Sequence, residues 1–423
     1  MTMYLALGLF ALTYVLLLVL PNVRAYVAAA SAALFVLLGI LPAGEVLRAV
    51  DWNVLLMIAG TMGTVALFIE SKMPSRLAEL LLARVPSVRW AIVALAVFAG
   101  LVSAFVDNVA TVLMLAPVAL AIAEKQRISP VPAVIAIAVS SNLQGAATLV
   151  GDTTSILLGG YAGMNFLDFF VFRGKMGMFF VVQLGALAAT AVLCVYLRRL
   201  TQPVMREGRT EVTDIFPTWL MVGTVALLIA ASFLPEKPAV TNGLICMGLF
   251  LLGAGRRCVL EKGIRPLAEA AKQLDYQTLL LLAGLFVVIA GVRAAGVIDA
   301  AARLLAGFGG GNVFAVYSLI VWGSVLLSAF IDNIPYVAAM LPVTANLAQI
   351  LGVEPYLLYF GLLTGATLGG NLTPIGASAN ITGIGILKKA GYTVRTGDFM
   401  KIGVPFTLCA VVTGYVLIWF LWR

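Results

Sequence analysis

The stretch SAFVDNVATVLMLAPVALAIA, residues 103–123, places one carboxylate, that of Asp107, inside an otherwise apolar run. The pattern returns 225 residues later as SAFIDNIPYVAAMLPVTANLA, residues 328–348, with Asp332 at the matching position. An asparagine follows each aspartate, giving the pairs Asp107-Asn108 and Asp332-Asn333. A charged carboxylate near the centre of a bilayer costs about 2.5–3.5 kcal/mol on insertion scales. Two of them at matched positions therefore indicate a functional site.

The composition predicts an all-α polytopic membrane protein. Of 423 residues, 62% are hydrophobic and 11% are charged, whereas soluble domains have about 25% charged residues. The mean hydropathy is +1.06, and apolar runs of about 20 residues, the length that crosses a bilayer, recur along the chain. The basic residues lie in short loops, so we expect a lipid bilayer and no nucleic acid as partner. With no histidine and no metal-like cysteine spacing, neither an enzyme nor a metal site is expected.

Two apolar segments, 90–123 and 312–350, are too long for one perpendicular crossing. The first would measure about 51 Å as a straight helix. If each segment crossed once, the 27 lysines and arginines would divide almost evenly between the two faces. If each is a re-entrant hairpin, 20 of them, Arg206 and Arg209 included, share one face. Basic loops stay in the cytoplasm, so we predict about ten transmembrane helices, two re-entrant hairpins, a cytoplasmic basic face and both termini outside.

The repeat extends beyond the hairpins. GAATLVGDTTS at 145–155 aligns with GNLTPIGASAN at 370–380, and DWNVLLMIAG at 51–60 aligns with DYQTLLLLAG at 275–284. Five predicted crossings separate the two hairpins, and an odd number gives the repeats opposite orientation. We expect four parts: N-terminal spans (1–44), a first inverted repeat (45–200, hairpin tip 107–108, broken helix 140–158), connecting spans and cytoplasmic loops (201–270), and a second inverted repeat (271–423, hairpin tip 332–333, broken helix 364–385).

Inverted repeats interrupted by glycine and proline point to the binding site of a secondary transporter. We expect Asp107, Asn108, Asp332 and Asn333 to bind a coupling ion or proton. The substrate site is expected among small and polar residues of the broken helices: Asn142, Thr148, Gly151, Asp152, Thr153, Asn371, Thr373, Pro374, Gly376, Ser378 and Asn380. Asp152 aligns with Ala377, so one carboxylate breaks the symmetry. The structural alternative is that the aspartates form turns and the small residues pack helices.

The motifs AFVDNVATVLMLAPV, AFIDNIPYVAAMLPV and GGNLTPIGASAN resemble the ion-transporter superfamily over roughly residues 45–420. They are most similar to the arsenite efflux permease and P-protein branch, which is related to divalent anion/sodium symporters. The resemblance implies a scaffold domain, a moving transport domain of the elevator type and a homodimer. The hairpin tips depart from the Ser-Asn-Thr of the symporters, and GDTTS at 151–155 departs from the Gly-Asp-Pro-Pro-Asn of P proteins.

The expected function is secondary active transport of a small inorganic ion by alternating access across a bacterial cytoplasmic membrane. A proton or sodium ion would drive it, with no other cofactor. An ionised carboxylate repels an anion at close range in a low dielectric, so an anion would need a proton or cation on the aspartates. The resemblance places proton-coupled arsenite or antimonite efflux, an antiport, first. Sodium/proton antiport and cation-coupled oxyanion or carboxylate transport are the alternatives, and a passive anion channel is less favoured.

Overall fold

The computed structural model describes residues 2–203, 210–234 and 236–423. Arg206 and Arg209, counted above on the cytoplasmic face, lie outside these ranges. The described chain is helical apart from connecting segments and one small antiparallel hairpin, in which β1 (Val171–Phe172) pairs with β2 (Lys175–Met176). The predicted all-α fold class is confirmed.

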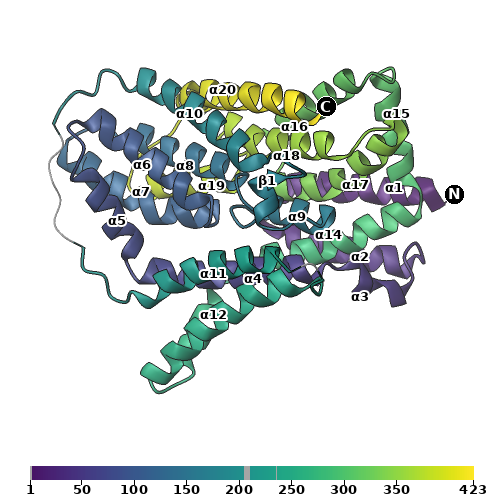
Figure 1. Ribbon diagram of the computed structural model, residues 1–423, viewed down its shortest axis with the longest axis horizontal. Helices are drawn as coiled ribbons and strands as arrows, with labels where there is room; N and C mark the ends of the chain where they lie inside the picture. Colours follow the sequence, from purple (N-terminus) through teal and green to yellow (C-terminus); the bar gives the residue numbers. More distant parts are fainter. Residues whose placement is uncertain (1, 204–209, 235) are drawn as a thin grey trace.

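Within the described ranges, ten α-helices of the first half are followed by ten in the same order in the second half. Figure 1 shows how they are arranged. The first ten are α1 (Thr2–Val19), α2 (Arg24–Leu37), α3 (Val46–Ala49), α4 (Trp52–Glu70), α5 (Met73–Leu82), α6 (Val88–Ser103), α7 (Asn108–Lys125), α8 (Val131–Gly145), α9 (Thr153–Ala162) and α10 (Met178–Tyr196). The second ten are α11 (Phe216–Ser232), α12 (Thr241–Leu260), α13 (Arg265–Lys272), α14 (Tyr276–Ala294), α15 (Val297–Phe308), α16 (Val313–Ser328), α17 (Asn333–Leu351), α18 (Tyr356–Gly369), α19 (Ser378–Lys389) and α20 (Thr396–Trp422).

The two halves are inverted relative to each other, as α4 and α14 show. Ile69 near the end of α4 and Asp275 at the start of α14 line one cavity. Asp51 at the start of α4 and Arg293 near the end of α14 line another. The two equivalent helices are therefore antiparallel. We call the side where α4 ends the Glu70 face, and the side where α14 ends the Arg293 face.

Helices of the two halves pack on each other, and we call α2, α4, α12 and α14 together the scaffold. α4 of the first half packs on α12 of the second, and α14 of the second packs on α2 of the first. Repeat-related glycines allow the close approach: a Cβ added at Gly60 would lie 2.3 Å from the carbonyl carbon of Cys246, and one at Gly284 would lie 2.7 Å from that of Ala28. Small residues at such crossings let helix backbones pack closely in a membrane. Figure 1 shows α4, α11 and α12 along the lower edge of the molecule.

The pairs α6–α7 and α16–α17 are re-entrant hairpins that enter from opposite faces. α17 returns to the side of α15, where Asn346 Nδ2 donates a hydrogen bond to Asp299 Oδ1. Because α15 follows the end of α14, the second hairpin enters from the Arg293 face. α5 follows the end of α4 and packs on both α6 and α7, so the first hairpin enters from the Glu70 face.

Eight helices of the described chain are long and apolar enough to cross a membrane, by length and composition. Two of these, α7 and α17, are hairpin arms. Four further crossings come from shorter segments. These are the apolar helices α2 and α11 and the two broken helices, α8–α9 and α18–α19. The described chain thus has about ten crossings and two hairpins, as predicted.

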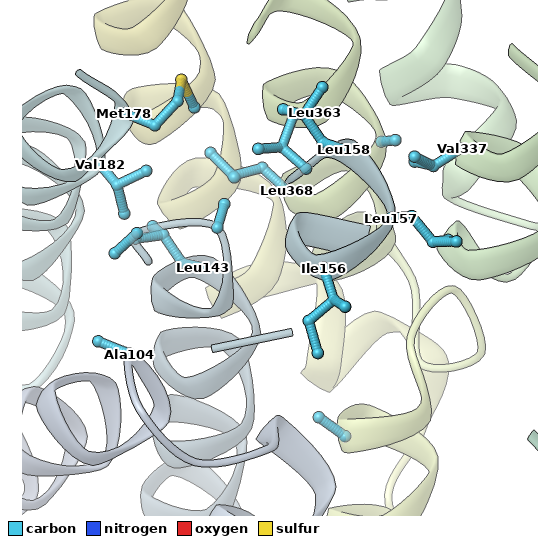
Figure 2. Close-up of a cluster of buried hydrophobic side chains, with 14 of the residues drawn as sticks. Ala104, Leu143, Ile156, Leu157, Leu158, Met178, Val182, Val337, Leu363 and Leu368 are labelled. Atoms are coloured by element: carbon cyan, nitrogen blue, oxygen red, sulfur yellow. The ribbon is translucent and has the colours of Figure 1, made fainter. Parts of the chain in front are cut away.

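The broken helices lie at the centre of the molecule, with α10 and α20 above them in Figure 1. The apolar side chains of α8, α9 and α18 are largely buried, where these helices pack on α10 and α17. Figure 2 shows the cluster, to which α8, α9, α10, α17 and α18 contribute Leu143, Ile156, Leu157, Leu158, Met178, Val182, Val337, Leu363 and Leu368.

Candidate functional site

Each hairpin tip is an aspartate that caps the second arm of its hairpin. Asp107 Oδ1 accepts hydrogen bonds from the backbone N–H of Val109 (3.0 Å) and Ala110 (3.1 Å) at the start of α7. Asp332 Oδ1 accepts one from Ile334 (3.1 Å) at the start of α17. Helix N-termini favour such side-chain acceptors. The cap uses Oδ1 of each carboxylate, so Oδ2 does not take part in capping and can meet another partner.

An equivalent threonine hydrogen bond in each half joins the hairpin to the broken helix of that half. Thr148 Oγ1 donates to the carbonyl of Ala104, and Thr373 Oγ1 donates to the carbonyl of Ala329. These carbonyls lie at the ends of α6 and α16, where no helical partner remains for them. Each threonine therefore supplies a missing bond and attaches the hairpin.

A glycine in each break completes this attachment. A Cβ added at Gly151 would lie 2.7 Å from the carbonyl oxygen of Gly145 and 2.9 Å from that of Ala104. At Gly376 the corresponding distances are 2.6 Å to the oxygen of Gly370 and 2.8 Å to that of Ala329. No side chain fits at either position without moving backbone.

Buried asparagines join the two halves. Asn142 Nδ2 donates to the carbonyl of Thr367 (2.7 Å) and to Oδ1 of Asn371 (3.1 Å), while Asn371 Nδ2 donates to the carbonyl of Val139 (2.9 Å). Asn142 and Asn371 are fully buried. Open backbone at membrane depth persists only where such partners satisfy it.

Two further asparagines extend this network. Asn108 Nδ2, at the first hairpin tip, donates to Oδ1 of Asn142 at 2.9 Å. Asn380 Nδ2 donates to the carbonyls of Gly370 (3.0 Å) and Thr373 (3.1 Å), which holds the second break closed. The amides therefore stabilise the interrupted backbone around the hairpin tips.

Asp152 connects the first broken helix to the second hairpin. Its Oδ1 accepts from the backbone N–H of Thr153 (2.7 Å), and its Oδ2 accepts from Thr154 Oγ1 (2.9 Å) and from Asn333 Nδ2 (3.2 Å). Asp152 as a whole is 4% exposed. Ala377 stands in its place in the second half, so this link is made only once.

Both hairpin tips line one cavity of about 400 Å³ on the Glu70 face, which we call the central cavity. Its scaffold wall comes from α4 and α14, with Asp275 at the rim and Met62, Val65, Ala66 and Ile69 along α4. Seven of the residues expected from the sequence line it: Asp107, Asn108, Asp152, Thr153, Asp332, Asn333 and Ser378.

The other expected site residues lie behind this lining and make the structural contacts described above. Thr148, Gly151, Asn142, Asn371, Thr373, Gly376 and Asn380 are buried, and Pro374 is half-buried in the second break. None of these eight is among the described residues that line the central cavity. In this structure they position the tips and the backbone instead of facing the cavity.

Sequence reasoning missed Arg24, which it counted as a loop charge. Arg24 begins α2, and its Nη1 lies 2.6 Å from Asp332 Oδ2. Ser378 Oγ donates to the same oxygen at 3.3 Å. The available signal was a single arginine directly before the apolar run 25–38. Its partner came from a segment more than 300 positions away, which no local pattern indicates.

A second cavity, of about 530 Å³, opens on the Arg293 face. Its scaffold wall consists of residues 224 positions away from those of the central cavity: Phe286, Ile289, Ala290 and Arg293 for Met62, Val65, Ala66 and Ile69, and Asp51 and Val54 for Asp275 and Thr278. Opposite this wall lie Leu157, Tyr161, Ala338 and Leu341 of α9 and α17. The scaffold thus lines a cavity on each face with repeat-equivalent positions, while both hairpin tips line only the central cavity.

The described residues contain no group of three or more histidine, cysteine or acidic side chains placed to hold a metal ion. The four cysteines are free thiols. The chemistry available at the central cavity is therefore that of carboxylates, amides, hydroxyls and one guanidinium.

Comparison of sequences finds transporters. The chain matches the profile of the CitMHS citrate transporter family over residues 14–365. It is 33% identical over 324 residues to the 46 kDa membrane protein of Mycobacterium leprae, covering 75% of this chain and 74% of that protein. It is 31% identical over 428 residues to the transporter Rv2684 of Mycobacterium tuberculosis, covering 98% and 97%. It is also 26% identical to the human P protein, covering 88% of this chain and 54% of that protein.

Comparison of structures finds the same kind of fold. The YdaH transporter of Alcanivorax borkumensis superposes with a TM-score of 0.60 at 16% identity, covering 86% of this chain and 84% of that one. MtrF of Neisseria gonorrhoeae superposes with a TM-score of 0.54 at 16% identity, covering 86% and 80%. At this level of identity the likeness concerns the fold alone.

Proposed function

The chain belongs to the CitMHS citrate transporter family of the ion-transporter superfamily, and from this we propose that it carries a small anion across the membrane by cation-coupled alternating access. It is a multi-pass secondary transporter and not an enzyme. The resemblance expected from the hairpin motifs is thereby confirmed. The observation that carries the proposal is the pair of repeat-related cavities, with both hairpin tips in one of them.

Alternating access follows from the symmetry of the scaffold wall. α4 and α14 present equivalent surfaces to the two faces, so the hairpin tips have an equivalent resting place beside the second cavity. Moving the hairpins and broken helices as one body along this wall would carry the site from one face to the other. Such an elevator motion agrees with the many contacts that hold each hairpin to its broken helix.

Coupling is assigned to Asp107 and Asp332, assisted by Asn108 and Asn333. The central cavity holds four carboxylates, those of Asp107, Asp152, Asp275 and Asp332. Their repulsion of an anion in a low dielectric would be relieved by a proton or sodium ion at the hairpin tips. Cation binding thereby favours anion binding. Thr153 and Ser378, whose hydroxyls face the same cavity, are proposed to contact the substrate, while Asp152 holds Asn333 beside it.

The substrate is proposed to be a small carboxylate or oxyanion, because the family is described by citrate transport. Proton-coupled efflux of arsenite or antimonite is the second candidate, supported by the hairpin motifs that resemble arsenite permeases. For the cellular setting we propose a bacterial cytoplasmic membrane, with the Glu70 face in the cytoplasm, both termini outside and a homodimeric assembly.

Flux into proteoliposomes tests the function. A pH or sodium gradient is imposed, and uptake of citrate, arsenite, antimonite or sodium is measured. We expect gradient-driven citrate uptake in the wild type and loss of coupled uptake in Asp107→Asn and Asp332→Asn, because each removes a site for the coupling cation. Arg173→Gln, at an exposed ion pair with Glu354, serves as the matched control.

Two results would contradict the proposal. Full coupled uptake in both aspartate variants would remove the hairpin carboxylates from the mechanism. Flux that follows the electrochemical gradient of the anion alone, at any pH or sodium gradient, would identify a passive channel.

A further inference from the structure

We infer that Arg24 determines specificity by binding the transported anion, and that the Asp332 carboxylate competes with the anion for the guanidinium. This inference rests on the proposed function, because it assumes an anion that enters the central cavity. Arg24 lies on α2 of the scaffold, whereas Asp332 lies at the tip of a hairpin. The pair therefore joins the two parts that must move relative to each other.

The geometry leaves Arg24 free to bind more than Asp332. One nitrogen, Nη1, contacts Asp332 Oδ2 at 2.6 Å, and the guanidinium forms no other hydrogen bond within the described chain. The Arg24 side chain is 32% exposed while Asp332 is 13% exposed. Its remaining N–H groups are available at the cavity wall. A guanidinium binds a planar carboxylate or an oxyanion through two parallel hydrogen bonds.

The charges around the cavity favour this assignment. Of the described residues that line the central cavity, Arg24 is the only cation, and it shares the cavity with four carboxylates, which come from the start of α14, the two hairpin tips and the first break. A guanidinium at the cavity wall would repel a transported cation and would form no ion pair with neutral arsenite. An anion needs one, since the carboxylates alone would repel it.

The repeat shows that the fold itself does not require this residue. The contacts at Gly284 and Gly60 align Ala28 of α2 with Cys246 of α12, which places Asn242 at the position equivalent to Arg24. In the first hairpin, Asp107 makes no salt bridge to any described residue. The ion pair is therefore a one-sided addition to a symmetric scaffold, as recognition of one ligand in one orientation would need.

Coupling follows from competition for the guanidinium. While Asp332 is ionised and carries no cation, its carboxylate holds Arg24, and this ion pair ties the scaffold to the hairpin. When a cation occupies Asp332, the attraction between Asp332 and Arg24 weakens, and the guanidinium turns to the anion. The neighbouring charges that act on this exchange are Asp107, Asp152 and Asp275. An anion is then accepted only after the cation has bound.

The test measures binding separately from transport. Thermal unfolding of the full-length protein in detergent is recorded with citrate, succinate, phosphate or arsenite, for the wild type, Arg24→Gln, Arg24→Lys, Asp332→Asn and the control Arg173→Gln. We expect citrate to stabilise the wild type and Arg173→Gln equally. The apparent affinity should fall at least about tenfold in Arg24→Gln, as loss of a charge-assisted bond implies, and by less in Arg24→Lys. Asp332→Asn should bind the anion more tightly, because the competing carboxylate is gone.

Several outcomes would overturn the inference: equal anion affinity in Arg24→Gln and wild type, binding of arsenite alone, or no anion binding in either the wild type or Asp332→Asn. If Arg24→Gln fails to fold, unchanged affinity in Asp332→Asn is decisive against it. Failure of the proposed function looks different. In that case Arg24-dependent binding is present, but no proton or sodium gradient drives uptake into proteoliposomes.

Discussion

At the scale of single residues, the site depends on carboxylates that are also structural acceptors. Asp107, Asp152 and Asp332 each cap a helix, so each negative charge is partly offset by backbone N–H groups. Asp152 differs from Asp107 because both of its oxygens accept hydrogen bonds, one of them from Asn333 of the opposite half, and it differs from Asp332 because all of these partners are uncharged. This arrangement suits a residue that positions the second hairpin beside the cavity.

Asp152→Ala should therefore lower both stability and transport. Losing the cap and the bond to Asn333 is expected to cost about 1–2 kcal/mol of unfolding free energy, and the freed hairpin tip should lower gradient-driven uptake. Thermal unfolding in detergent and the proteoliposome assay measure the two effects. The control is Asp299→Ala. The Asp299 carboxylate accepts a hydrogen bond from Asn346 at the base of the second hairpin, and this variant should retain transport. Normal uptake by Asp152→Ala would show that the cross-half bond is dispensable.

At the scale of elements, the glycines of the two breaks decide whether hairpin and broken helix move together. Both Gly151 and Gly376 pack against backbone oxygens at distances that leave no room for a Cβ. Backbone cannot yield as a flexible side chain does, so overpacking here separates the hairpin from its support.

Gly151→Ala and Gly376→Ala are each expected to destabilise the protein by about 1–3 kcal/mol and to lower transport. Gly323→Ala in the middle of α16 is the matched control. A Cβ there meets no atom within 4 Å, and alanine is the better helix former by about 1 kcal/mol. Melting temperatures of the three variants give the comparison. A Gly323→Ala protein less stable than Gly151→Ala would refute the packing account.

The sequence predicted these elements because their chemistry is local. An aspartate in an apolar run, a glycine beside a polar residue and a proline inside a span each mark interrupted helix within a few positions. The packing of α4 on α12 and of α14 on α2 could not be predicted from a local pattern. Gly60 and Gly284 contact residues that are distant in the sequence, Cys246 and Ala28. The ion pair between Arg24 and Asp332 was not predicted for the same reason. The polar residues predicted for the two broken helices do lie close together in the structure. Eight of the predicted site residues, however, lie behind the lining and do not line the central cavity.

At the scale of the whole molecule, the inverted halves specify a second conformation. Val65 of α4 and Val109 of the first hairpin tip share the central cavity. Their repeat counterparts are Ile289 of α14, which lines the second cavity, and Ile334 of the second hairpin tip, which lines the central one. In the present structure these counterparts are on different cavities. Exchanging the roles of the two halves would bring them together on the Arg293 face.

Cysteine cross-linking tests this second conformation. In a background without the four native cysteines, Val65→Cys with Val109→Cys should cross-link in the conformation seen here. Ile289→Cys with Ile334→Cys should cross-link only after the hairpins have moved, so its yield should rise when substrate and coupling cation are both present. Ile289→Cys with Ala338→Cys, which share the second cavity now, should show the opposite change. If the yield of Ile289→Cys with Ile334→Cys stays at background under every gradient while transport is intact, the hairpins do not travel along the α4–α14 wall. The two cavities would then be linked by local gating around a fixed site.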